Sequence, residues 1–303
     1  MMMAEPLHPS AVRGALTENE PMARHVTWRT GGMADRCFVP ADLDDLSALL
    51  RQLPRAEPLL FVGLGSNLLV RDGGFRGTAV LMHSAARRPV LDKGLVHAAA
   101  GVASPKVARF AALHDLSGAE FLAGIPGTVG GALAMNAGCY GGETWNIVDR
   151  VVTIDRSGVQ RIRARDEFST GYRRCELKTH GEEWFAAAWF RLPQGDGAIA
   201  RERIKNFLAR RVATQPLQLP NAGSVFRNPA GDHAARLIES CGLKGLQRGG
   251  ARVSEKHANF IVNPKGAGRA SDIEWLIDSV RTTVRERTGV NLQPEVRIVG
   301  EAR

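Results

Sequence analysis

Cysteine is scarce in this chain, and the four cysteines lie far apart, at Cys37, Cys139, Cys175 and Cys241. No two of them form a CxxC pair, and no histidine stands at metal-ligand spacing from them. Disulfide frameworks and structural zinc sites need such clusters. The sequence therefore argues against both, predicts no metal site, and favours reduced thiols in a cytosolic protein.

Long apolar runs are also missing. The best candidates, 59–62 and 96–100, have the length of a strand, whereas a membrane-spanning helix needs about 18 or more apolar residues. Residues 1–13 contain no apolar stretch of secretory length. We therefore expect a protein of the cytoplasm that does not bind a membrane.

Aromatic residues make up only 6% of the 303 residues, and no cluster of them could stack the bases of a single strand. The formal net charge of +9 favours anionic partners. The basic residues are not gathered in one stripe, however, because between 149 and 166 they alternate with aspartates. The composition thus argues against nucleic acid and favours small anions such as phosphate esters or carboxylates.

The apolar periodicity predicts a mixed α+β protein with at least two units that divide near residue 215. One helix is expected over 42–53, and another over 271–288, with Ser271 and Glu274 as a capping box and Gly289 at its end. Residues 151–162 are typical of a hairpin, and the first twenty residues look like a loose arm. The other expected elements are strands at 59–62, 78–82, 95–100, 185–192, 258–262 and 296–299, and helices at 104–115, 198–212 and 232–241.

Two glycine-rich loops stand in the first half of the chain. The turn at 63–67 follows a strand, but Leu68 replaces the third glycine of a Rossmann fingerprint, so it is not a Rossmann site. The stretch 124–131 has four glycines, and Thr128 could cap the apolar segment that follows it. Together the loops suggest one long ligand, such as a dinucleotide. Ordinary turns in a loop-rich fold are the alternative.

Three polar residues outside these loops could share one reaction. Arg173 stands beside a tyrosine, Ser224 lies between a glycine and an apolar pair, and Glu295 stands at the entrance of a strand. Taken singly, each is typical of a surface charge or a turn. Together they could supply an anion clamp, a proton donor and an electrostatic partner for a polar addition.

Six blocks, in this order, resemble the UDP-N-acetylenolpyruvoylglucosamine reductase family, over nearly the whole chain. They are GLGSNLLV at 63–70, GIPGTVGGALAMNAG at 124–138, GYR at 171–173, NAGSVFRNP at 221–229, GLKGLQRGGARVSEKHANFIVN at 242–263 and PEVRIVG at 294–300. The resemblance implies a two-part FAD-binding unit of the vanillyl-alcohol-oxidase type (21–88 with 294–303, and 89–214). It also implies a C-terminal α+β substrate-binding domain (215–293).

The resemblance implies an activity as well: NADPH-dependent, FAD-mediated reduction of UDP-N-acetylglucosamine enolpyruvate to UDP-N-acetylmuramate, in bacterial peptidoglycan synthesis. FAD would be held tightly but not covalently, and we expect a monomer. Ser224 would be the proton donor, while Arg173 and Glu295 would polarise the carboxylate and stabilise the intermediate. FAD would contact Gly63, Gly65, Ser66, Asn67, Leu68, Pro126, Gly127, Thr128, Gly131 and Gly138. The substrate would contact Tyr172, Arg227, Asn228, His257 and Asn259.

The chain departs from the family pattern in three places. Cys175 stands where serine is commoner, and Arg227 replaces the commoner lysine, which keeps the charge but changes the donor geometry. The segment from Arg173 to Trp184 is short and lacks the tyrosine-bearing insertion of one subgroup, so the chain resembles the compact second type. The alternatives are an FAD-dependent oxidase of the same flavin fold and a flavin- or nucleotide-binding regulator without catalysis.

Overall fold

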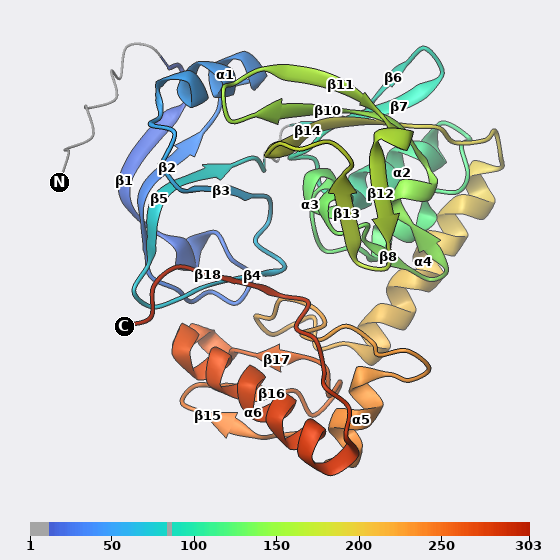
Figure 1. The fold of residues 1–303 in the computed structure, drawn as a ribbon. Coiled ribbons are helices and arrows are strands. Elements are labelled where there is room, and N and C mark those ends of the chain that lie inside the picture. Colours follow the sequence, from blue (N-terminus) through green and yellow to red (C-terminus); the bar gives the residue numbers. More distant parts are fainter. Residues whose placement is uncertain (1–11, 84–86) are drawn as a thin grey trace. The chain divides into compact units, whose positions relative to one another are not determined.

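The computed structural model describes residues 12–83 and 87–303. These residues form two compact units, each built from separate pieces of the chain. Of the described residues, the first unit takes those up to Glu18, Arg36–Gly63 and those within Gly77–Ala209. The second unit takes Asn19–Asp35, Leu64–Arg76 and Arg210–Arg303. Helices and strands occur in both, which confirms the predicted α+β class (Figure 1).

A four-stranded sheet has the strand order β1-β2-β5-β3, with β3 parallel to β5. Leucines of helix α1 cover it because they recur on one face, and Asp42 caps the helix by accepting from the Asp45 amide. The prediction of this helix and of strand 59–62 is confirmed. The bounds are β1 Ala15–Pro21, β2 Met33–Val39, α1 Leu43–Gln52, β3 Leu59–Val62 and β5 Phe75–Leu81.

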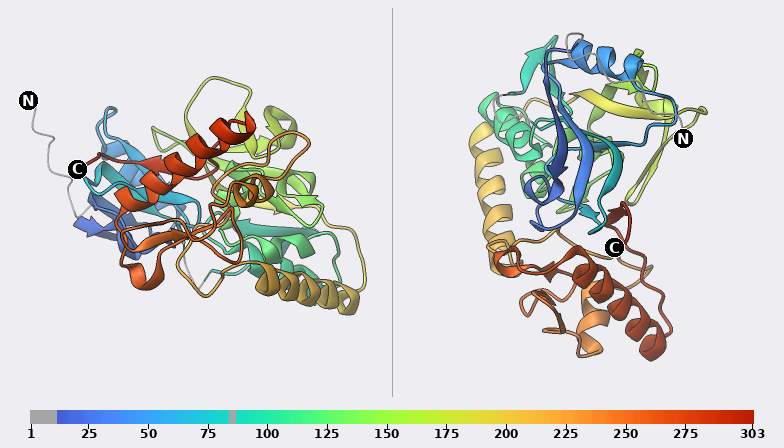
Figure 2. Two further views of the ribbon diagram at one scale, coloured as in Figure 1. Left: turned by 90° about the horizontal axis from the view of Figure 1, so that it is seen from below. Right: turned by 90° about the vertical axis from the view of Figure 1, so that its left-hand side faces the viewer.

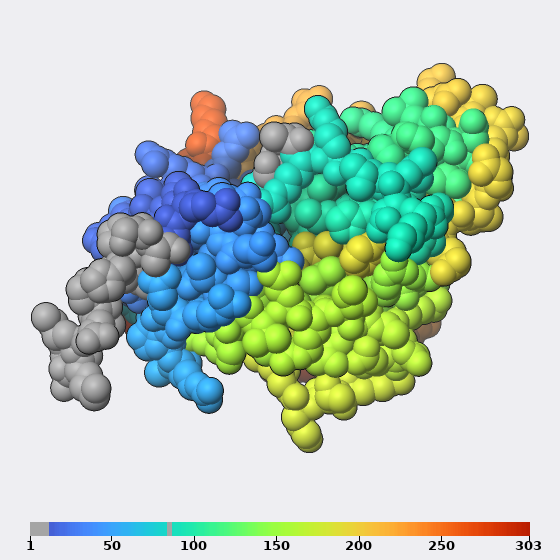
Figure 3. Space-filling view, turned by 90° about the horizontal axis from the view of Figure 1, so that it is seen from above, coloured from blue at the N-terminus to red at the C-terminus, as the bar shows by residue number. Residues whose placement is uncertain are grey.

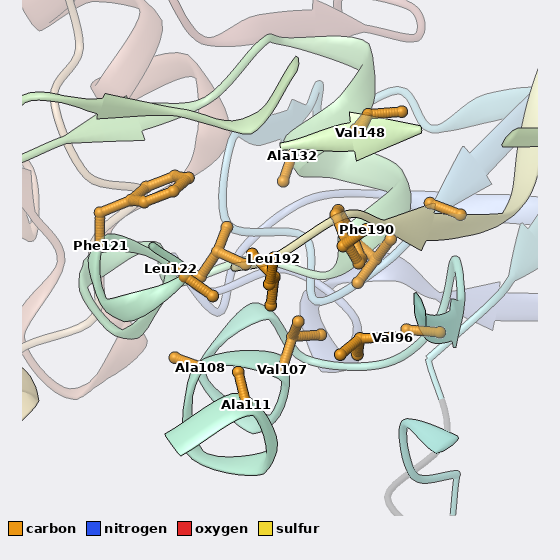
Figure 4. Packing of buried hydrophobic residues seen from close by; sticks show 14 of the residues in the cluster. Val96, Val107, Ala108, Ala111, Phe121, Leu122, Ala132, Val148, Phe190 and Leu192 are labelled. Atoms are coloured by element: carbon orange, nitrogen blue, oxygen red, sulfur yellow. The ribbon is translucent and has the colours of Figure 1, made fainter. Parts of the chain in front are cut away.

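The larger sheet of the first unit has the order β11-β10-β14-β7-β6. Its central strands bury one face against helices α2 and α3, and Val96, Val107, Leu122 and Phe190 lie in the resulting core (Figure 4). The bounds are β6 Val90–Asp92, β7 Leu95–Ala99, α2 Ser104–Leu113, α3 Val129–Ala134, β10 Val148–Asp155, β11 Gln160–Ala164, β14 Glu183–Phe190 and α4 Gly197–Thr214.

The β10–β11 hairpin reaches helix α1. Gln160 Nε2 donates to Asp44 Oδ1 at 2.9 Å and to Ser47 Oγ at 3.1 Å. Gly158 has φ +74°, and a Cβ there would lie 2.5 Å from the Ser47 carbonyl oxygen. Figure 3 shows the two surfaces side by side, α1 in blue and the hairpin in yellow-green. The predicted hairpin is confirmed, and its glycine is required by this contact.

Two short hairpins complete the first unit. Strands β8 and β9 pair with each other, as do β12 and β13. The second pair leaves only Tyr172 and Arg173 for its turn. The bounds are β8 Gly138–Cys139, β9 Gly142–Glu143, β12 Phe168–Gly171 and β13 Arg174–Leu177.

The second unit is built around helix α6, which packs on the sheet β15-β16-β17 (Figures 1 and 2). A separate pair joins β18 in parallel to β4, with Val299 opposite Val70. The bounds are β4 Leu68–Val70, α5 Ala234–Ser240, β15 Gln247–Arg248, β16 Ala251–Val253, β17 Ile261–Val262, α6 Ala270–Thr288 and β18 Arg297–Val299.

Three local predictions are wrong. The expected loose arm contains strand β1 from Ala15 onward, while residues 1–11 lie outside the described residues. The strand expected at 258–262 is reduced to β17, because Asn259 and its neighbours turn before it. Helix α6 is not capped by the pair Ser271 and Glu274. Its first amides, of Ala270 and Ser271, donate to the Asp72 carboxylate instead, both at 3.0 Å.

Candidate active site

The turn after β3 requires its glycines. A Cβ on Gly63 would lie 2.3 Å from the Thr128 hydroxyl, so this glycine lets the two predicted cofactor loops approach each other. Gly65 has φ +62°, and a Cβ there would lie 2.1 Å from the His25 carbonyl oxygen. The Thr27 amide donates to the Gly65 carbonyl at 3.2 Å and helps to hold the turn in place. Backbone conformation and close contacts therefore explain why the turn at 63–67 has glycine at positions 63 and 65.

The second loop is held by its backbone. The Ser104 amide donates to the Gly127 carbonyl at 2.9 Å, and the Val129 amide to that of Val102 at 2.8 Å. Thr128 occupies the N-cap position of α3, but its side chain makes no capping hydrogen bond, so that part of the prediction is wrong. Its hydroxyl points toward Gly63 instead. Pro126 and Gly131 are exposed on either side of it.

Each of the two loops has the residue types that suit a phosphate group of a nucleotide. Pro126 and Gly131 present exposed backbone, and a Cβ on Gly131 would meet nothing closer than the Thr128 hydroxyl at 3.9 Å. Ser66 and Asn67 are half-buried and bring side-chain donors to the first turn. Bare backbone with small polar side chains is the usual surroundings of a phosphate group. Leu68 begins β4 and is buried.

Arg173 lies in the two-residue turn between β12 and β13, with φ +55°. Its Nη2 donates to the carbonyl oxygen of Gly138, at 3.0 Å, and its guanidinium lies 5.2 Å from the centre of the Tyr172 ring. The first unit thus brings together three predicted site residues from two motifs, Tyr172 and Arg173 from one and Gly138 from the other. Tyr172 is 49% exposed and so is open to a ligand.

Asn136 was missed by the sequence analysis, although it stands inside the block at 124–138. Its side chain is buried and donates to the Gly171 carbonyl at 3.0 Å and to Glu143 Oε2 at 3.0 Å. Its own Oδ1 accepts from the Trp145 amide at 3.1 Å. The signal that could have found it is a polar side chain within an otherwise apolar and glycine-rich run.

Cys175 lies on β13, next to this turn. Burial raises the pKa of its thiol to about 12, so the side chain is an uncharged thiol at neutral pH. A thiolate is the nucleophilic form of cysteine. The residue that replaces the commoner serine is therefore inert in this position.

Ser224 and Glu295 lie on neighbouring backbone segments of the second unit. The Glu295 amide donates to the Val225 carbonyl at 2.7 Å, and Phe226 pairs with Pro294. Asn67 Nδ2 donates to the Glu295 carbonyl at 3.1 Å across 228 residues of sequence. This unit therefore unites the predicted proton donor, the predicted carboxylate and part of the first glycine loop.

Arg227 and Asn228 continue the same segment. The Arg227 amide donates to the Gln293 carbonyl at 2.9 Å. Its Nε is buried, and no hydrogen-bond partner for it exists among the residues that the structure describes. A buried guanidinium nitrogen without a partner fits a site that binds an anion. Asn228 is exposed, and its Oδ1 accepts from the Ala234 amide at the start of α5.

His257 and Asn259 lie at the turn before β17. Burial lowers the pKa of His257, and its ring meets that of Phe260 edge-on with 4.7 Å between centres. The imidazole is therefore neutral at physiological pH. Asn259 is only 3% exposed, and its amide bonds to the backbone of Phe226.

Comparison with known proteins defines the class first. Residues 34–162 match a family model described as FAD binding domain, so the chain contains a flavin-binding domain of an oxidoreductase. Residues 215–299 match a second model, described as UDP-N-acetylenolpyruvoylglucosamine reductase, C-terminal domain. The chain belongs to the UDP-N-acetylenolpyruvoylglucosamine reductase family, as its six motif blocks indicate. It is accordingly an enzyme of the oxidoreductase class.

Individual relatives are similar over almost their full length. A UDP-N-acetylenolpyruvoylglucosamine reductase of Thiobacillus denitrificans is 57% identical, covering 96% of this chain and 94% of the relative. One from Legionella pneumophila is 52% identical over 97% of this chain and 96% of its own length. The crystal structure of UDP-N-acetylenolpyruvylglucosamine reductase from Thermus caldophilus has a TM-score of 0.79 at 30% identity. It covers 94% of this chain and 98% of that one.

Within 12–83 and 87–303, no helix has the length and hydropathy that crossing a membrane requires. Over the same described ranges, no group of three or more His, Cys, Asp or Glu side chains could hold a metal ion.

Proposed function

We propose that this chain reduces the enolpyruvyl ether of UDP-N-acetylglucosamine to UDP-N-acetylmuramate, with NADPH as the source of hydride and FAD as its carrier. The observation that carries the proposal is the pairing of the Ser224 segment with Glu295, and of Glu295 with Asn67. Backbone contacts thus bring the serine and the glutamate of the proposed reaction next to a predicted flavin loop. We assign the reaction to peptidoglycan synthesis in a bacterial cytoplasm.

FAD, when bound, supplies the hydride-carrying chemistry that amino-acid side chains lack. The loops at 63–68 and 126–131, with Gly138, are the residues we assign to holding it, without a covalent bond. The protonated thiol of Cys175 is consistent with a non-covalent cofactor, because a thiol with its pKa near 12 is a poor nucleophile.

Ser224 would donate a proton to the substrate carbon next to the carboxylate. A serine hydroxyl is a weak acid, so it can protonate only a strongly basic substrate anion. Fixed hydrogen-bond donors must stabilise the charge of that anion until the proton arrives. We assign the guanidinium of Arg173 to the substrate carboxylate, because its Gly138 contact and its place in a two-residue turn hold it rigidly. Glu295 would balance the positive charge of Arg173 and help to stabilise the enolic intermediate of the substrate.

Arg227 would bind the diphosphate of the substrate, since its buried Nε has no partner among the described residues. Asn228 and Tyr172 are exposed and would contact the sugar nucleotide. His257 and Asn259 were predicted as further contacts, and neutral His257 would offer a hydrogen bond rather than a charge. The net charge of +9 would attract both anionic substrates.

We further propose that the enzyme works as a monomer and is organised in three parts. Residues 21–88 with 294–303 would form the first FAD-binding subdomain and 89–214 the second, while 215–293 would bind the sugar nucleotide. The parallel pairing of β18 with β4 supports the assignment of the C-terminal strand to the first subdomain.

The test is an anaerobic titration of the purified, FAD-loaded protein followed by its visible spectrum. NADPH should bleach the flavin absorbance, and the enolpyruvyl sugar nucleotide should restore it with formation of UDP-N-acetylmuramate. Recovery with oxygen but not with this substrate would indicate an oxidase. Failure to bind FAD at all would refute the proposal. Ser224→Ala should slow only the second step, and equal damage to both steps would contradict the role of Ser224.

A further inference from the structure

The Asn259 side chain pairs with Phe226 as a neighbouring strand would. Its Oδ1 accepts from the Phe226 amide at 2.9 Å, and its Nδ2 donates to the Phe226 carbonyl at 2.8 Å. The Asn259 carbonyl accepts from the Val225 amide at 2.9 Å. Three hydrogen bonds therefore join one residue to the two residues that follow Ser224.

The opposite side of the same segment is held by the residues around Glu295. The Val225 carbonyl accepts a hydrogen bond from the Glu295 amide, and the Arg227 amide donates to the Gln293 carbonyl. The dipeptide Val225–Phe226 thus lies between two partners, Asn259 on one side and the 293–295 segment on the other. Both of its side chains are buried.

On the N-terminal side of Ser224, Ala222 is buried in the core of the unit, and Gly223 then turns the chain. Gly223 has φ +75°, and a Cβ there would meet nothing within 4 Å. The Gly223 amide donates to Asn221 Oδ1, a contact inside the same turn. The backbone position of Ser224 is therefore set in part by the dipeptide that follows it, which Asn259 holds.

Asn259 is also badly placed to bind a ligand. It is 3% exposed, and both ends of its amide already bond to buried backbone. A side chain in this state orders the chain around it, since breaking either bond would leave a buried polar group of Phe226 unsatisfied.

We infer that Asn259 is a positioning residue that holds Ser224 in register with Glu295, and not a residue that contacts the substrate. This inference rests on the proposed role of Ser224 as proton donor. It makes a distinction that can be measured: loss of a substrate contact weakens substrate binding, whereas loss of positioning slows the step that uses the positioned group.

The experiment compares the two half-reactions of FAD-loaded enzyme by anaerobic stopped flow. Asn259→Ala should slow reoxidation of the flavin by the enolpyruvyl substrate by about 10²-fold, the scale of a small misplacement of a reacting group. Flavin reduction by NADPH and the Kd of the substrate should change by less than about threefold, within ordinary context effects. A large rise in Kd with an unchanged limiting rate would overturn the inference.

A double-mutant cycle with Ser224→Ala makes the test specific. If Asn259 acts through Ser224, then Asn259→Ala should have little further effect once the hydroxyl is gone. Full additivity of the two losses would overturn the inference. If Ser224→Ala alone leaves reoxidation unchanged, the proposed role of Ser224 fails instead, so the two failures are distinguishable.

Asn263→Ala is the matched control, since Asn263 is a buried asparagine of the same unit. Its side-chain amide bonds to the backbone of Trp28 and Gly268, both of which lie outside the Ser224 segment. It should lower stability without selective loss of reoxidation, and an equal kinetic loss would overturn the inference. Asn259→Asp, nearly the same size, keeps the acceptor for the Phe226 amide but sets a carboxylate oxygen against the Phe226 carbonyl. Repulsion there should displace the Ser224 segment and give the same selective loss, and unimpaired reoxidation at a pH where this carboxylate is ionised would contradict the inference.

Discussion

Asn136 donates an amide hydrogen to the carbonyl oxygen of Gly171, at 3.0 Å, and so anchors the turn that carries Arg173. We predict that Asn136→Ala destabilises the protein by about 1–3 kcal/mol, because it leaves buried polar groups unsatisfied. It should also slow flavin reoxidation by the enolpyruvyl substrate by about 10²-fold. Urea unfolding and stopped-flow kinetics measure the two effects.

The control for this prediction is Thr144→Val. Thr144 is buried in the same region, and its hydroxyl donates to the Ala137 carbonyl at 2.7 Å, outside the hairpin turn. It should lower stability but spare the kinetics. If both variants slow reoxidation equally, Asn136 has no particular connection with Arg173.

Gly65 and Gly94 separate two reasons for a glycine. Both have positive φ, +62° and +80°, but only at Gly65 would a Cβ meet backbone, at 2.1 Å. Gly94→Ala should therefore cost only about 1–2 kcal/mol of conformational strain. Gly65→Ala should cost more and release FAD, measured as flavin absorbance per protein after gel filtration. Equal behaviour of the two variants would contradict a cofactor role for this turn.

Asp72 should make the stability depend on pH. Burial alone would raise the pKa of Asp72. The hydrogen bonds from Ser271 and Ala270 lower it by more than burial raises it, so the net pKa is below the usual value. A carboxylate with a depressed pKa stabilises the fold above its unfolded pKa of about 3.9, and this contribution disappears as pH falls through the folded pKa.

We therefore expect Asp72→Asn to destabilise the protein by about 1 kcal/mol at pH 7, as loss of a helix cap does. The difference from the unmodified protein should shrink below about pH 4, where the carboxylate is being protonated. Urea unfolding at several pH values measures it. A difference that is constant from neutral pH to pH 3 would refute the role of the charge.

Cys175 should resist alkylation in the folded protein. With its pKa raised to about 12 by burial, it carries almost no thiolate between pH 7 and 9. Peptide mass spectrometry after iodoacetamide treatment should find it unmodified while folded and modified once unfolded, where its pKa returns to about 8.5. Rapid labelling of the folded protein near pH 8 would contradict this.

Elements whose stability is local could be predicted from the sequence. The leucine spacing of α1 and the turn glycine of the β10–β11 hairpin act over a few residues, as does Gly289, which ends α6 with φ +75°. The cap of α6 could not, because Asp72 stands 198 residues earlier in the chain. Glu274, free of the expected capping role, pairs with Arg71 at 2.7 Å.

The same reasoning applies to the candidate site. The glycine loops could be recognised in the sequence, because positive φ and close contacts at positions such as Gly65 exclude other residues. Nothing local in the sequence indicates that Ser224 lies beside Glu295, since backbone pairing between distant segments brings them together. Only the family resemblance linked these residues, and Asn136 and Asn259 acquire their roles only through contacts in the folded chain.

The pairing of β18 with β4 imposes an order on biosynthesis. Val299 pairs with Val70, and the second unit draws on residues from both ends of the described chain. All residues of the first unit have been translated once the ribosome reaches Ala209. The segment around β4 is made early, and it can pair only after residues 297–299 have left the ribosome. A translation product interrupted after Ala209 would therefore carry Arg173 but lack both Glu295 and β18, the strand that pairs with β4 next to the first glycine loop.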